Sequence, residues 1–192
     1  MKVLVGCEES GVVSQAFRDL DLGHEVWSCD LQPTRGDKDW HICGDVIQAL
    51  RSQEWDLVIL HPDCTAMAVS GNRWYGKGMP MNDKRKEAVE WTLDLWELAK
   101  ARANRVVLEN PVSVIFSHID NVQYIQPWQH GHGETKKTGL ALHGVPPLRP
   151  TNVVSGRENR VWRMPPGPNR KRDRSKTYQG IANAMANQWG EQ

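Results

Sequence analysis

Two short polar segments, each directly after an apolar run, hold side chains that could act together in catalysis. His61-Pro-Asp-Cys64 ends one run, and Glu109-Asn-Pro111 ends a later one. A cysteine thiol can attack an electrophilic carbon, and a neighbouring carboxyl group can handle the proton that such a reaction moves. The two segments therefore predict a nucleophile, Cys64, and a proton-handling partner, Glu109, in one cleft. The alternative for a lone cysteine is a packed thiol.

A third polar segment, Gly6-Cys-Glu-Glu-Ser-Gly11, ends the first apolar run and has two glycines where a ligand could approach the backbone. It is neither the GxGxxG of a dinucleotide-binding fold nor a triphosphate loop, which needs Gly-Lys-Ser/Thr. Glu8 and Glu9 would repel a phosphate, whereas they suit a cation such as the sulfonium or ammonium group of S-adenosylmethionine. We therefore expect this segment to bind that cofactor.

Two further acids end the next two apolar runs. Asp30 follows the glycine loop by about 20 residues, the spacing at which an acid binds ribose hydroxyls in nucleotide-binding α/β folds. Asp45 could reach the amino group of an adenine ring. The alternatives are a helix-capping acid for Asp30 and a simple turn for Asp45.

The elements that must position these residues follow from the apolar patterning. Short apolar runs alternate with amphipathic stretches, which predicts an α/β fold with a mostly parallel sheet and helices on both faces. Ligands of such sheets bind outside the carboxyl ends of the strands, where the candidate residues lie. The expected strands are 2–7, 25–30, 40–45, 55–61, 105–109, 122–126 and 138–142, and the expected helices are 12–20, 83–102 and 178–189.

The bulk composition narrows the class of protein. At 192 residues the chain suffices for one core, so we expect a single domain over 1–192. Hydrophobic residues make up 39% and charged residues 24%, which is typical of a soluble globular protein. The first residues lack the pattern of a signal peptide, so we expect a cytoplasmic protein with no membrane partner.

The cysteine and histidine spacing favours neither a metal site nor a disulfide framework. The four cysteines form no CxxC pair, and we expect most of them to be buried thiols. His130 and His132 flank a glycine, but no third ligand stands at a suitable spacing, so we expect no bound metal.

A basic segment at 143–176, rich in proline and arginine, is expected to be irregular. Residues 149–176 hold nine Lys/Arg and two acids, although the whole chain has a net charge of only +1. Such a segment can neutralise nucleic-acid phosphates by releasing their counterions. The alternative is a solvated loop.

The order of these segments resembles that of the cytosine-5 DNA methyltransferases. That family has a Pro-Cys nucleophile loop after the fourth strand, a Glu-Asn pair after the fifth and a cofactor loop after the first. Gln179-Gly-Ile-Ala-Asn-Ala-Met185 is similar to its last motif, so the resemblance spans nearly the whole chain. Here Asp63 stands between Pro62 and Cys64, and an anionic neighbour is expected to raise the thiol pKa. The family's large target-recognition domain is missing.

The resemblance implies a Rossmann-like, S-adenosylmethionine-dependent methyltransferase fold and assigns roles to single residues. Cys64 would add to carbon 6 of cytosine, Glu109 would bind the ring nitrogen and amino group, and Asn110 would position Glu109 or the base. The expected cofactor-binding residues are Gly6, Cys7, Glu8, Glu9, Ser10, Gly11, Asp30, Leu31, Asp45, Val46, His61 and Asn183. The expected substrate contacts are Pro62, Asp63, Trp74, Gln126, His132, Lys136, Lys137, Arg170 and Arg172.

Three functions stay open from the sequence. The first is methylation of cytosine carbon 5 in single-stranded or duplex DNA, and the small size suits a phage- or prophage-type enzyme. The second is the same chemistry on a free pyrimidine nucleotide, because little surface is left for duplex DNA. The third is a non-catalytic protein that binds S-adenosylmethionine or nucleic acid, for which Asp63 is the best support.

Overall fold

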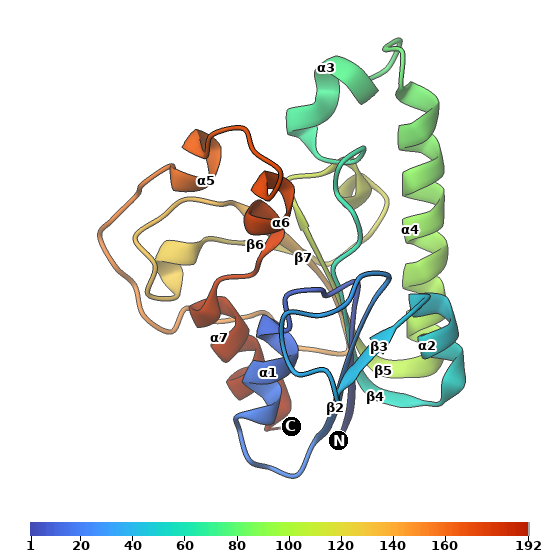
Figure 1. The fold of residues 1–192 in the computed structure, drawn as a ribbon, viewed down its shortest axis with the longest axis vertical. Coiled ribbons are helices and arrows are strands. Elements are labelled where there is room, and N and C mark those ends of the chain that lie inside the picture. Colours follow the sequence, from blue (N-terminus) through green and yellow to red (C-terminus); the bar gives the residue numbers. More distant parts are fainter. Residues whose placement is uncertain (192) are drawn as a thin grey trace.

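The computed structural model describes residues 1–191 and contains a seven-stranded sheet (Figure 1). The sheet has the order β3-β2-β1-β4-β5-β7-β6; its first five strands are parallel, and β7 runs antiparallel to both neighbours. The strands are β1 (Lys2–Gly6), β2 (Glu25–Asp30), β3 (His41–Cys43), β4 (Trp55–Leu60), β5 (Ala103–Pro111), β6 (Val122–Ile125) and β7 (Thr138–His143).

Helices cover both faces of the sheet because the strand residues alternate between two buried cores. On β1, Val3 and Val5 face the core under α1 and α7, whereas Leu4 faces the core under α2 and α4 (Figure 1). The helices are α1 (Val12–Arg18), α2 (Val46–Ser52), α3 (Asn72–Tyr75), α4 (Asn82–Arg102), α5 (Arg160–Arg163), α6 (Arg170–Ser175) and α7 (Gln179–Gly190). The predicted α/β fold with a mostly parallel sheet is confirmed.

Some local predictions were wrong. Only Cys29 among the four cysteines is fully buried, and Cys43 is exposed because it lies at the end of the edge strand β3. Residues 143–176 are not wholly irregular, since they contain α5 and α6.

The strand order places the candidate residues together. In the parallel part of the sheet, β1 lies between β2 and β4, and β4 lies beside β5. Their carboxyl ends therefore meet at one edge, which carries the loop after Gly6, the acid Asp30, the Cys64 loop and Glu109. No helix among residues 1–191 is long and apolar enough to cross a membrane.

Candidate active site

Two hydrogen bonds join the end of β5 to the segment that carries Cys64. The Nδ1 atom of His61 lies 3.1 Å from Oε2 of Glu109, and both side chains are nearly buried. The fully buried side chain of Asn110 donates from Nδ2 to the carbonyl oxygen of Pro62 at 3.0 Å. These contacts fix His61 and Pro62 against β5. The start of the segment that leads to Cys64 is therefore held in place.

The carboxyl group of Glu109 is held in its ionised form. Burial alone would raise its pKa, but the hydrogen bond and charge of His61, together with the charge of Lys136, outweigh that effect and lower the pKa below its usual range. An ionised carboxylate in this place can accept hydrogen bonds from a ligand that carries N–H groups.

The Cys64 thiol is half-buried and has a raised pKa. Burial is the main cause, and the charges of Glu109 and then Asp63 add to it, in the direction that the sequence predicted. The charge of Lys136 opposes the shift and so favours a thiolate. Its Nζ atom donates to the carbonyl oxygen of Lys176 at 3.3 Å and lies 5.9 Å from the ring centre of Tyr178, so Lys136 acts on Cys64 and Glu109 through its charge and not through a direct contact.

Arg85 of α4 supports the chain that follows Cys64, and the sequence interpretation missed it. This buried guanidinium donates from Nε to the carbonyl oxygen of Ala66 at 2.7 Å and from Nη2 to that of Ala68 at 3.2 Å. Its position is in phase with the apolar stripe of the helix, since Ala88 lies three residues on. A charge in phase with an apolar stripe is the signal that could have revealed it.

The glycine loop after β1 is shaped by its own contacts. The carboxylate of Glu8 is buried and accepts hydrogen bonds from the backbone N–H groups of Val13 at 2.6 Å and Ser14 at 3.2 Å, so it caps α1. Gly11 has a φ of 69°, and a Cβ atom there would lie 2.9 Å from the Cα atom of Gly36. The expectation that Glu8 meets the cationic cofactor is therefore corrected: its carboxylate binds a helix end.

Three other acids lie around the mouth of this loop. Burial raises the pKa of Cys7 to about 12, and the charges of Asp30, Asp45 and Asp63 add to the shift. Asp30 and Asp45 both accept local backbone hydrogen bonds through Oδ1, at 2.8 and 2.9 Å. An acidic mouth of this kind fits the cationic groups and hydroxyls of S-adenosylmethionine, so the residues present are compatible with that cofactor.

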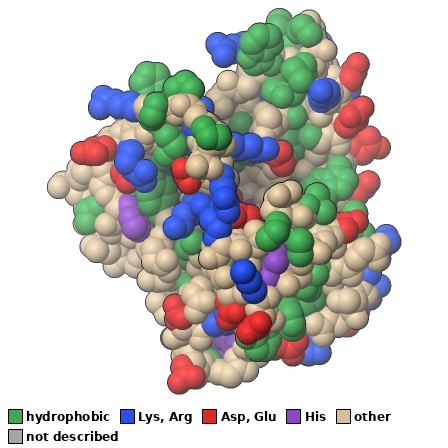
Figure 2. All heavy atoms as spheres, viewed as in Figure 1, with side chains coloured by type: hydrophobic (Ala, Val, Ile, Leu, Met, Phe, Trp, Pro, Cys, Tyr) green, Lys and Arg blue, Asp and Glu red, His purple; other side chains and the backbone are tan. Residues whose placement is uncertain are grey.

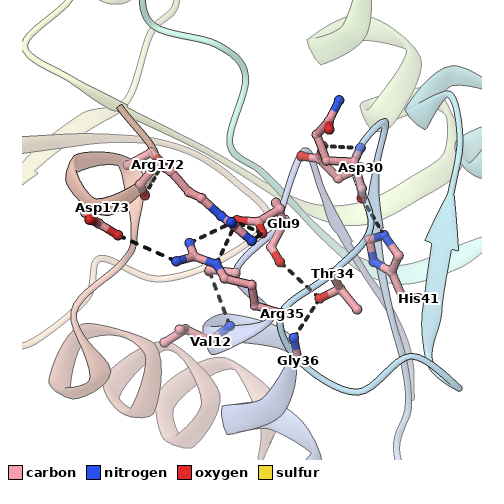
Figure 3. Close-up of polar contacts among 12 residues, drawn as sticks. Glu9, Val12, Asp30, Thr34, Arg35, Gly36, His41, Arg172 and Asp173 are labelled. Atoms are coloured by element: carbon pink, nitrogen blue, oxygen red, sulfur yellow. Dashed lines mark hydrogen bonds and ion pairs between the residues drawn. The ribbon is translucent and has the colours of Figure 1, made fainter. Parts of the chain in front are cut away.

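The basic segment reaches both loops through α6. Arg172 and Arg35 pair with the carboxylate of Glu9, and Asp173 lies 3.7 Å from Arg35 (Figure 3). Glu9 therefore has partners within the protein, and its contact with the cofactor stays a prediction. Figure 2 shows Lys and Arg side chains gathered over α6, at the border of a hollow between this helix and α4. Sequence reasoning missed Arg35.

The other predicted contacts divide into two groups. The first group binds backbone atoms near the basic segment. Gln126 accepts a hydrogen bond from the N–H of Lys136 at 3.1 Å, and His132 accepts one from the N–H of Gly180 at 2.9 Å. Arg170 donates to the carbonyl oxygen of Met164 at 2.8 Å. The rest have positions of other kinds. Val46 is buried in the core against Gly6, and Lys137 lies over the ring of Tyr124 on the edge strand β6. Trp74 on α3 and Leu31 are 52% and 74% exposed. Ser10 accepts a hydrogen bond from the N–H of Val12, and Asn183 accepts one from Gln179 on the surface of α7.

Val46 and Lys137 have contacts within the protein, and their predicted ligand contacts stay predictions. The Val46 side chain is packed under Gly6 and is only 6% exposed, and the Lys137 ammonium group lies over the ring of Tyr124, 4.4 Å from its centre. Among residues 1–191 no group of three or more His, Cys, Asp or Glu side chains is arranged to hold a metal ion.

Comparisons with known proteins support the fold. No protein-family model and no curated protein matches the chain. Among solved structures, it is similar to a protein described provisionally as a DNA modification methyltransferase encoded within a prophage of E. coli, with a TM-score of 0.53 and 10% identity over 80% of this chain and 52% of the other. The Dnmt2 methyltransferase of S. pombe (TM-score 0.48, 12% identity, 84% and 53% coverage) and a DNMT2 mutant of Spodoptera frugiperda (0.41, 14%, 80% and 54%) are more distant in structure.

The first of these matches shows that the chain has a Rossmann-like fold of the methyltransferase type. The chain spans about half the length of the solved structures that it resembles.

Proposed function

We propose that the chain is an S-adenosylmethionine-dependent methyltransferase that acts on carbon 5 of cytosine in DNA, with Cys64 as the nucleophile. The observation that carries this proposal is the joining of the Cys64 segment to the end of β5. The bonds from His61 to Glu109 and from Asn110 to Pro62 hold a thiol and an ionised carboxylate at neighbouring strand ends. The methyltransferase-type fold and the acidic mouth around Cys7 support it.

The proposed chemistry uses groups of this chain in balanced steps. The Cys64 thiol loses its proton to solvent, and its sulfur forms a bond to carbon 6 of the ring, which makes carbon 5 nucleophilic. The ring nitrogen takes up a proton, and the ionised Glu109 accepts hydrogen bonds from that N–H and from the amino group. S-adenosylmethionine, when bound, would supply the methyl group that carbon 5 takes, with its sulfur–methyl bond broken and S-adenosylhomocysteine as the leaving group. Loss of the carbon 5 proton to solvent and of the ring-nitrogen proton then breaks the sulfur–carbon bond and releases Cys64.

Lys136 and Asn110 have supporting roles in this proposal. The cation of Lys136 opposes the rise in the Cys64 pKa, so it would stabilise the thiolate that attacks and later leaves. Asn110 would keep the Cys64 segment in place through Pro62 rather than contact the base. A base in duplex DNA would have to leave the helix to reach Cys64.

DNA is favoured over a free nucleotide because α6 carries a cluster of cations beside the cleft. A second candidate function, binding without turnover, is favoured by the raised pKa of Cys64, since a protonated thiol is a poor nucleophile.

The decisive experiment follows labelled methyl groups from S-adenosylmethionine to single-stranded DNA, duplex DNA and dCMP. The wild type should label cytosine carbon 5 in DNA, Cys64→Ser should not, and Cys43→Ser, which changes an exposed thiol outside the Cys64 loop, should retain activity. Cofactor binding is measured in parallel for all three proteins. Transfer that survives in Cys64→Ser would refute the nucleophile, and cofactor binding without any transfer would favour the binding protein.

A further inference from the structure

Helix α6 carries three consecutive charged residues that pair with three different loops of the cleft. Lys171 Nζ lies 2.9 Å from Oδ2 of Asp63, in the loop of the proposed nucleophile. Arg172 donates from Nε to Oε1 of Glu9 at 3.0 Å, in the loop after β1. Asp173 lies near Arg35, which itself pairs with Glu9 (Figure 3).

These pairs tie a distant segment across the cleft. The Lys171 bond joins residues 108 positions apart, and the Arg172 bond joins residues 163 positions apart. Both cations stay accessible, with side chains 73% and 47% exposed. A ligand from solvent can therefore reach the same cations that the two carboxylates hold.

Carboxylate and phosphate oxygens bind these cations in the same way. The guanidinium fork of arginine accepts either anion in a bidentate geometry, and lysine attracts either as a point charge. Exposed ion pairs of this kind are weak, so an incoming polyanion can displace the internal carboxylates. The backbone of DNA supplies such a series of phosphates.

We propose that Lys171 and Arg172 form a binding site for the phosphates of the target DNA strand, which Asp63 and Glu9 occupy until DNA displaces them. This inference rests on the proposed function, because it takes DNA as the partner. Asp63, which interrupts the Pro-Cys sequence, then has a role of its own as the internal competitor for phosphate. DNA binding breaks the links from α6 to both loops, so it is coupled to their release.

The test measures the affinity of short fluorescein-labelled DNA, single-stranded and duplex, by fluorescence anisotropy at low salt. Asp63→Asn keeps the Oδ1 acceptor for the N–H of Thr65 and removes only the charge that holds Lys171. It should raise the affinity about two- to fivefold, the value of an exposed ion pair. In a Lys171→Gln background the same substitution should give no gain, because the masked cation is absent.

A matched control is Glu54→Gln, which breaks the 2.8 Å ion pair with Arg102. These two residues lie at the amino ends of β4 and β5, away from the cleft at the carboxyl ends, so this variant should leave the DNA affinity unchanged. An equal gain with and without Lys171 would mean that Asp63 only repels DNA, and would overturn the inference, as would no gain at all. Absence of DNA binding in every variant, together with methyl transfer to dCMP, would overturn it and leave the methyltransferase intact. A gain in DNA affinity from Asp63→Asn that disappears in the Lys171→Gln background, without any methyl transfer, would support the phosphate site and reject the enzyme.

Discussion

Replacing His61 by leucine would leave the nearly buried carboxylate of Glu109 without its hydrogen-bond partner. The two side chains are only 11% and 13% exposed, and removal of one partner of a buried pair costs about 3–5 kcal/mol. We therefore expect the free energy of unfolding at pH 7 to fall by about that amount. His61→Gln, which can still donate a hydrogen bond, should lose less.

The pH dependence of this loss has a definite sign. In the wild type the pKa of Glu109 is lowered, so its contribution to stability is present above the unfolded pKa and is lost as the pH falls through the folded pKa. In His61→Leu, burial would raise that pKa, so the folded state would bind the proton more tightly. The variant should then lose stability as the pH rises above the unfolded pKa, with a slope of up to about 1.4 kcal/mol per pH unit.

Urea unfolding of the wild type and of His61→Leu between pH 5 and pH 8 measures both effects. The double variant with Glu109→Gln is the control, because an amide has no charge to desolvate and should lose the pH dependence of the variant. A loss smaller than about 1 kcal/mol, or one independent of pH over this range, would show that Glu109 does not need His61 to stay ionised.

Three further predictions concern the supports of the site. Gly180→Ala should lower stability by about 1–3 kcal/mol or more in thermal unfolding, because its Cβ atom would lie 1.8 Å from a backbone oxygen, whereas Gly167→Ala, with no atom within 4 Å, should be nearly neutral. Arg85→Met should cost about 1–3 kcal/mol in urea unfolding, since it strips the carbonyl oxygen of Ala66 of its donor and leaves that of Ala68 with the N–H of Gly71 alone, and a loss below about 1 kcal/mol would contradict that role. Asp63→Asn should move the rising limb of the pH–rate profile for methyl transfer to lower pH, because it removes a charge that raises the pKa of Cys64. An unmoved limb would show that ionisation of the Cys64 thiol does not control the rate.

The parts of the fold that the sequence predicted are those with a repeating signal. The runs that became β1, β4 and β5 are apolar on both faces, as buried parallel strands must be, and α4 has a long helical stripe. Helix α2 escaped prediction because its seven residues cover less than two full turns and show no clear period. The antiparallel insertion of β7 between β5 and β6 depends on pairing that no local pattern encodes.

The candidate site was predictable to the extent that it lies on strand ends. The positions of Cys64 and Glu109 follow from the apolar runs before them, but the partners of their neighbours do not. The bond of His61 to Glu109 could not be read from the sequence, and neither could that of Glu9 to Arg172, which comes from a segment far along the chain. Weak, exposed ion pairs between distant loops leave no periodicity in a sequence, so only the folded arrangement shows them.

The raised pKa of Cys64 is compatible with a nucleophile because its causes are ones that a bound substrate would change. After burial, the largest cause is the negative charge of Glu109, whose carboxylate is bonded through Oε2 to His61. Under the proposed function, a cytosine protonated on its ring nitrogen offsets that charge when it bonds to Glu109. The thiol pKa then falls at the moment when a thiolate is needed, with Lys136 as the remaining cation. A resting thiol that is protonated, and is activated by its own substrate, therefore reconciles the electrostatics of the cleft with covalent catalysis.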